Sequence, residues 1–132
     1  MSGDKSSNGG VERLDVTRAE GLWAVRSEST TVYYVDLDRG RLLRARGAGS
    51  QRFDFDDEWV KLVQVSSRDE LSGTVQNGEV RVGARPRYLT DPLPTALSYQ
   101  WRLQREVTSI ERVTEEEADA LRERTPEGSD SP

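Results

Sequence analysis

Two residue types are missing from this chain of 132 residues, which contains no cysteine and no histidine. Without cysteine it forms no disulfide, thiolate metal site or cysteine nucleophile, and without histidine it lacks the side chain that most often moves protons near neutral pH. A zinc site would have to consist of carboxylates alone, which is unusual for zinc in proteins. These absences predict a protein that is not an enzyme and that holds no cofactor.

A long hydrophobic run is also missing, because no stretch approaches the roughly 20 apolar residues that cross a bilayer. The opening MSGDKSSNGG has no apolar core that a secretion pathway would recognise. We therefore expect no membrane association and a cytoplasmic location. Lysine is scarce, since Lys5 and Lys61 are the two lysines among 19 basic residues. A preference for arginine suits GC-rich coding and suggests a bacterial or phage accessory protein.

The negative charge is concentrated at the end of the sequence. Residues 11–113 contain 16 acidic and 16 basic side chains, whereas residues 114–132 contain 7 acidic and 2 basic ones. The net charge of -5 therefore belongs to the acidic C-terminal region. A neutral body argues against non-specific nucleic-acid binding, which depends on neutralising many phosphates.

Short segments rich in valine, tyrosine and threonine, separated by turn residues, predict β-strands along most of the chain. The expected strands lie at 22–27, 30–37, 41–46, 59–65, 74–76 and 79–82. Strand 59–65 is the most apolar and is expected to be central. Asn77-Gly78 is typical of a type I′ turn and predicts a tight hairpin. The two prolines of residues 90–94 predict a loop.

Towards the C-terminus, Tyr99, Trp101 and Leu103 alternate with polar residues, which predicts a strand with its large apolar side chains on the core face. Residues 98–113 also fit a helical stripe, so a long helix is the alternative. Thr114 and Glu117 form a capping-box pattern and predict a short acidic helix over residues 114–124.

These elements predict an all-β, mainly antiparallel domain, folded as a small barrel or sandwich of about six or seven strands, similar in size to SH3-like and OB-like barrels. The expected organisation is a disordered leader at 1–10, an ambiguous lead-in at 11–21, a single β domain at 22–113 with the helix after it, and a disordered tail at 125–132. Trp23, Trp59 and Trp101 are expected to be core residues rather than a ligand cage.

The segment FDFDDEW, Phe53 to Trp59, places four acids between aromatic residues. It lacks the spacing of a calcium loop, in which acids alternate and a glycine stands at the sixth position. In a strand that ends at a turn, Phe53 and Phe55 would share the core face, leaving the acids exposed. We therefore interpret the acids at 54–58 as a solvated hairpin tip, with weak cation binding as the alternative.

The arginines around the 41–46 strand are the main basic concentration and lie near two tyrosines. A binding surface there would consist of Tyr33, Tyr34, Arg41, Arg44, Arg46 and Arg52. Arginine and tyrosine side chains grip phosphates and stack on bases, so a barrel that binds single-stranded nucleic acid is one hypothesis. Pairing of these arginines with nearby acids on the solvent side is the simpler explanation.

The function that the residues favour most is a non-enzymatic protein-interaction module, which binds a protein partner through its β domain and carries the acidic C-terminal region as a separate arm. No catalytic pair stands out. The glycines at 47–49 lack the lysine and the helix signal of a phosphate-binding loop.

Overall fold

The computed structural model describes residues 10–93 and 99–119. The expected leader, apart from its last residue, the expected tail and the second half of the expected helix lie outside these residues. Within them the protein consists mainly of antiparallel strands, with helical residues at 115–119. No helix in this part of the chain is long and apolar enough to cross a membrane.

Within the described ranges, eleven strands form two sheets. Their bounds are β1 Gly10–Val11, β2 Arg13–Asp15, β3 Leu22–Ser27, β4 Val32–Asp36, β5 Arg41–Ala45, β6 Trp59–Arg68, β7 Val75–Asn77, β8 Glu79–Arg81, β9 Arg85–Asp91, β10 Gln100–Leu103 and β11 Val107–Val113. The main sheet has the order β1-β11-β3-β4-β5-β6-β9-β10, with β7 added beside β6. Strands β2 and β8 form a separate two-stranded sheet.

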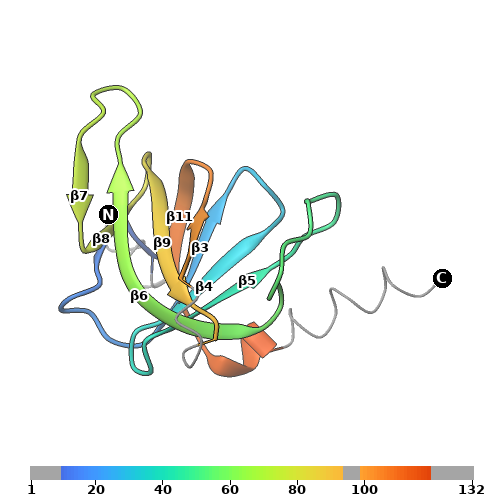
Figure 1. The fold of residues 1–132 in the computed structure, drawn as a ribbon. Helices are drawn as coiled ribbons and strands as arrows, with labels where there is room; N and C mark the ends of the chain where they lie inside the picture. The colour runs from blue at the N-terminus through green and yellow to red at the C-terminus, as the bar shows by residue number, and fades with distance from the viewer. Residues whose placement is uncertain (1–9, 94–98, 120–132) are drawn as a thin grey trace.

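The main sheet is strongly curled but remains open, and Figure 1 shows the long, bent β6 along one side of it. Curling brings β4 and β9 face to face, so that the rings of Tyr33 and Tyr88 stack with centroids 5.1 Å apart. The amide of Val107 donates to the carbonyl oxygen of Ala84 at 3.0 Å. The expected small barrel or sandwich of about six or seven strands is wrong, because the described residues form eleven strands and the main sheet is open, with β1 and β10 at its two ends.

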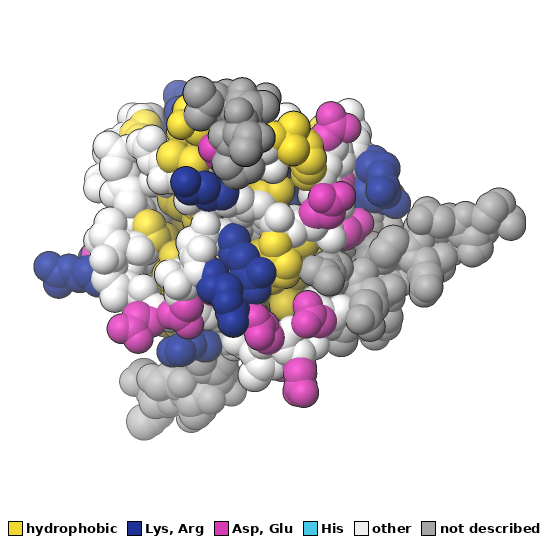
Figure 2. Space-filling view, turned by 60° about the horizontal axis from the view of Figure 1, so that its bottom comes forward, with side chains coloured by type: hydrophobic (Ala, Val, Ile, Leu, Met, Phe, Trp, Pro, Cys, Tyr) yellow, Lys and Arg dark blue, Asp and Glu magenta, His cyan; other side chains and the backbone are white. Residues whose placement is uncertain are grey.

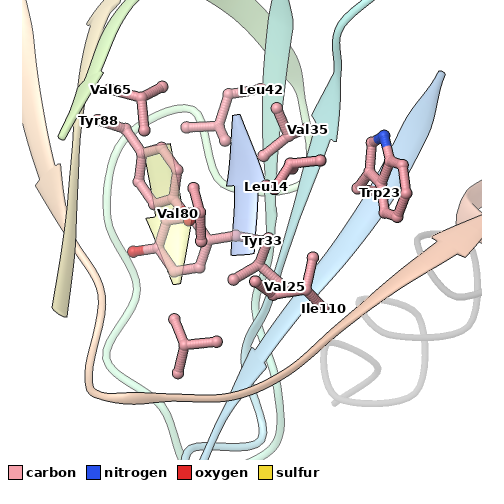
Figure 3. Packing of buried hydrophobic residues seen from close by; sticks show 11 residues of the cluster. Leu14, Trp23, Val25, Tyr33, Val35, Leu42, Val65, Val80, Tyr88 and Ile110 are labelled. Carbon is pink, nitrogen blue, oxygen red and sulfur yellow. The ribbon is translucent and has the colours of Figure 1, made fainter. Parts of the chain in front are cut away.

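Most of the core lies inside this curl, where valines and leucines surround the stacked tyrosines (Figure 3). Leu14 and Val80 of the two-stranded sheet belong to the same cluster and cover it. A second cluster lies on the opposite face of β3, β4 and β5 and includes Ala118 of the helical segment. Since these three strands bury both faces, Tyr33 and Tyr34 are both inaccessible although they point in opposite directions.

Several local predictions are confirmed. β3 has the expected bounds, and Gly40 takes the positive φ that its turn requires. Within residues 99–113, the described part of the 98–113 range, the chain forms two strands and not a long helix. The capping box is present, because the amide of Thr114 donates to the Glu117 carboxylate at 2.8 Å and the amide of Glu117 donates to the Thr114 hydroxyl at 3.2 Å.

The hairpin expected at Asn77-Gly78 is wrong. β7 pairs with β6 and β8 pairs with β2, so the chain passes from one sheet to the other at this point. Gly78 has a φ of 78°, but Asn77 does not have positive φ, and a type I′ turn needs it at both central residues. The backbone of Gly78 is instead held by Val65 and Val16, to which its amide and carbonyl groups are hydrogen-bonded.

The lead-in at 11–21, left ambiguous by the sequence, contains β2 and one of the two residues of β1. Two further expectations need correction. β6 extends to Arg68 and lies inside the sheet. Among Trp59–Val65, however, only Val65 is buried. A register shift in the pairing with β9 after Leu62 leaves Val63 exposed. Thr90 and Asp91, expected in a loop, end β9 because they pair with Leu62 and Lys61.

Candidate functional site

The tyrosines and arginines proposed as a binding surface do not form one. The exposed fractions of Tyr33 and Tyr34 are 3% and 1%, and the two rings lie in different core clusters. Base stacking requires an accessible ring face, so neither tyrosine can supply it in this fold.

The arginines of the same set are mostly engaged in internal contacts. The Nε of Arg41 donates to the Oδ2 of Asp36 at 2.9 Å, and its guanidinium lies 4.1 Å from the centre of the Trp59 ring. Arg46 is half-buried, and its Nη1 donates to the carbonyl oxygen of Ser50 at 3.2 Å. Arg44 is buried, whereas Arg52 is exposed. Only Arg52 of these four is fully available to a ligand.

The surface charge is mixed rather than basic. On the face that Figure 2 shows, Lys and Arg side chains are interspersed with Asp and Glu side chains, and the described residues drawn there form no continuous basic stripe. This matches the balanced charge of the body of the chain. A backbone-tracking groove for nucleic acid needs a continuous row of cations.

In the acidic segment after β5, Asp54 and Glu58 are exposed as expected, but Asp56 and Phe53 have the opposite of their expected environments. Asp56 is only 5% exposed, and its Oδ2 accepts a hydrogen bond from the Nη1 of Arg44 at 2.6 Å and another from the amide of Phe53 at 2.8 Å. Phe53, expected in the core, is 38% exposed. Phe55 and Asp57 adopt φ angles of 68° and 65°, which turn the chain so that Asp56 points inwards.

A cation site is not assembled from these acids. Within residues 10–93 and 99–119 no group of three or more Asp and Glu side chains is arranged to hold a metal ion. The Asp57 carboxylate is partly buried beside Asp56 and accepts a hydrogen bond from the amide of Arg46 at 3.2 Å. Its pKa is raised, mainly because burial removes it from water, although the bond from Arg46 opposes the shift. The segment is therefore a loop fixed by a buried ion pair.

A row of exposed large apolar side chains lies on β10 and just before it. Tyr99, which precedes the strand, and Trp101 and Leu103 within it, all expected to face the core, have exposed fractions of 57%, 44% and 58%. Trp101 is paired with Leu89 of β9 and Leu103 with Arg87, so these side chains share the outer face of the sheet. We call Tyr99, Trp101, Leu103 and Leu89 the β10 face.

The alternate residues of β10 explain this orientation. Gln104, just after the strand, is buried, and its Nε2 donates to the carbonyl oxygen of Val25 at 2.9 Å. The Tyr88 hydroxyl donates to the Oε1 of Gln104 at 2.7 Å. Because neighbouring side chains of a strand alternate between faces, fixing Gln104 inside the curl places Leu103 and Trp101 outside.

No sequence signal would have revealed this exposure, since an apolar row on a strand normally faces the core. The tryptophans also differ from the expected set of three core residues: Trp23 is buried, Trp59 is half-buried against the second cluster, and Trp101 is exposed.

Comparison of the chain with protein-family models, with curated proteins and with solved structures found no match. The functional conclusion therefore depends on the surfaces of this chain.

Proposed function

We propose that this chain is a non-enzymatic protein-interaction module that binds an extended segment of a partner protein at β10. The observation that carries the proposal is the β10 face itself. Tyrosine and tryptophan are enriched in protein interfaces, where their large rings supply much of the binding free energy. Exposing two aromatic rings and a leucine in one row to water is unfavourable unless a partner covers them.

The position of β10 supports the same function. It is the last strand of the main sheet, and no described strand pairs with its outer edge. An extended peptide can add to such an edge through backbone hydrogen bonds while pockets or ridges of the sheet select its side chains. The edge is short, four residues, so the aromatic face has to contribute most of the selectivity.

The charge near β10 indicates the kind of partner. Arg87 lies over the Trp101 ring, with its guanidinium carbon 4.4 Å from the ring centre. Arg102 lies on β10, but its side chain points to the other face, where its Nη2 donates to the carbonyl oxygen of Asp54. A partner segment that combines apolar residues with an acidic one would match the β10 face and Arg87.

The test is a selection of displayed peptides on the immobilised protein, followed by titration of the selected peptides by fluorescence anisotropy. Trp101→Ala should weaken binding about thirtyfold, as expected for an aromatic hot spot, and Tyr99→Ala should weaken it less. Leu71→Ala is the matched control, because Leu71 is 99% exposed but lies in the turn after β6.

Two results would contradict this function. One is a set of selected peptides that bind Trp101→Ala as tightly as the parent protein. The other is self-association of the protein through β10, seen in sedimentation as a dimer that Trp101→Ala dissociates. Thermal unfolding of each variant without peptide checks that the fold is intact.

A further inference from the structure

A polar cavity lies at the end of the curl, beside β10 but distinct from the β10 face apart from Leu103. It has a volume of about 440 Å³ and is bounded by the β3–β4 connection, the segment after β5 and the residues that follow β10. Small-molecule sites in proteins commonly have volumes of roughly 300–1,000 Å³. The cavity is therefore large enough for a metabolite-sized ligand.

The floor of the cavity is held in place by buried hydrogen bonds. Arg44 donates from its Nε to the Tyr33 hydroxyl oxygen at 3.1 Å and from its Nη1 to the carbonyl oxygen of Gln51 at 3.2 Å. Gln104 is fixed between Tyr88 and the backbone of Val25, as described above. Burial raises the pKa of the Tyr33 hydroxyl, so it stays protonated at neutral pH. A ligand would meet polar groups that are already positioned.

The charge on the walls is positive. Three arginines, Arg44, Arg85 and Arg105, line the cavity, and no described Asp or Glu lines it. Asp56 neutralises Arg44 from behind. The Nε of Arg85 donates to the carbonyl oxygen of Gln104 at 3.4 Å, and its Nη1 lies 4.0 Å from the partly exposed carboxylate of Glu70. The side chain of Arg105 is exposed and makes no hydrogen bond or ion pair with any residue that the structure describes.

We propose that this cavity binds a small phosphate monoester with a hydroxyl-rich body, such as a sugar phosphate. Arg85 and Arg105 together match the charge of a phosphate dianion, and guanidinium groups recognise phosphate through paired hydrogen bonds. The walls carry serine and threonine hydroxyls, with few apolar side chains, which suits a sugar rather than an apolar ligand. This site is independent of peptide binding at the β10 face.

The experiment is calorimetric titration with ribose 5-phosphate at pH 7.5 and fixed ionic strength, with ribose, inorganic phosphate and gluconate as comparison ligands. Ribose 5-phosphate should bind saturably and raise the melting temperature, because a ligand of the native state stabilises it. Ribose should not bind, and inorganic phosphate should bind more weakly. Gluconate, a carboxylate with one negative charge, should also bind more weakly.

Arg85→Gln and Arg105→Gln should each weaken binding at least about tenfold, since each removes a charged donor. Arg18→Gln is the matched control, because Arg18 is an exposed arginine that does not line the cavity. Both cavity arginines are accessible to solvent, so the variants should keep the melting temperature of the parent protein.

Three outcomes would overturn the proposal. The first is no saturable binding of ribose 5-phosphate up to about 10 mM, a concentration that detects even very weak complexes. The second is unchanged binding in the Arg85→Gln, Arg105→Gln double variant, and the third is binding of ribose or gluconate as tight as that of the phosphate ester. Peptide binding measured on the same double variant keeps this test separate from that of the β10 face.

Discussion

The guanidinium of Arg44 donates from its Nη1 to the Oδ2 of Asp56 at 2.6 Å, with the Asp56 side chain fully buried. Arg44 is the penultimate residue of the buried strand β5, and Asp56 belongs to the loop that follows the strand. The ion pair therefore fixes this loop against the sheet and at the same time places Arg44 on the floor of the cavity. A buried pair of this kind is costly to break, because one charge remains without a partner.

Asp56→Asn should lower the free energy of unfolding by on the order of 3 kcal/mol, since it leaves the Arg44 charge buried and unbalanced. Urea unfolding at pH 7 measures the loss. Asp54→Asn is the control, because Asp54 is exposed and should change stability by less than about 0.5 kcal/mol. Equal effects of the two substitutions would show that the ion pair contributes nothing.

The partly buried carboxyl of Asp57 should make the stability of the fold depend on pH. Burial raises the pKa of its carboxyl above the ordinary value of 3.8, so the folded state holds the proton more tightly than the unfolded chain does. Stability should therefore fall as the pH rises through the interval just above 3.8, and the loss persists at neutral pH.

Asp57→Asn should remove this loss while keeping an acceptor for the Arg46 amide, and asparagine tolerates the positive φ at this position. The variant should be more stable than the parent at pH 7 by about 0.5 kcal/mol or less, because the carboxylate is only partly shielded from water. Chemical unfolding from pH 3 to pH 7 measures the difference. A difference that is constant over this range would contradict the assignment to Asp57.

Gly47 should not tolerate a side chain. A Cβ at this position would overlap the backbone of Thr30, whereas one at Gly49 would meet no atom within 4 Å. Gly47→Ala should therefore cost more than about 2 kcal/mol in unfolding free energy, and Gly49→Ala only the roughly 1 kcal/mol of its positive φ. Thermal and urea unfolding compare the two, and similar costs would show that the loop moves away freely.

Gln104 joins β9 to β3 across the open side of the curl. Gln104→Leu would leave the Tyr88 hydroxyl and the Val25 carbonyl group without partners, which should cost about 2 to 4 kcal/mol. The double variant Tyr88→Phe, Gln104→Leu removes one of these orphaned groups and should recover part of the loss. Hydrogen exchange should accelerate in β3 and β9 of the single variant, and unchanged exchange there would contradict the bridging role.

The sequence alone determined those strands, turns and caps that depend only on residues close to one another in the chain. The branched and aromatic residues of β3 and β4 favour an extended backbone in any context. The capping box of Thr114 and Glu117 closes within one helical turn, and Gly40 sets its turn by itself. The absence of cysteine and histidine is likewise a property of the sequence alone. These features need no knowledge of distant contacts.

Only the tertiary structure decided which face of each strand is covered. Trp101 was expected in the core but is exposed, and Asp56 was expected at the surface but is buried. A sequence pattern shows that the two faces of a strand differ, but not which face meets the rest of the protein. The orientation of β10 is fixed by hydrogen bonds of Gln104 to partners 16 and 79 residues away in the sequence. The conformation of the acidic loop is fixed by the ion pair of Asp56 with Arg44, 12 residues away. Asn77-Gly78 fails as a hairpin for the same reason: β6 and β2 supply hydrogen-bond partners that outweigh a local turn preference.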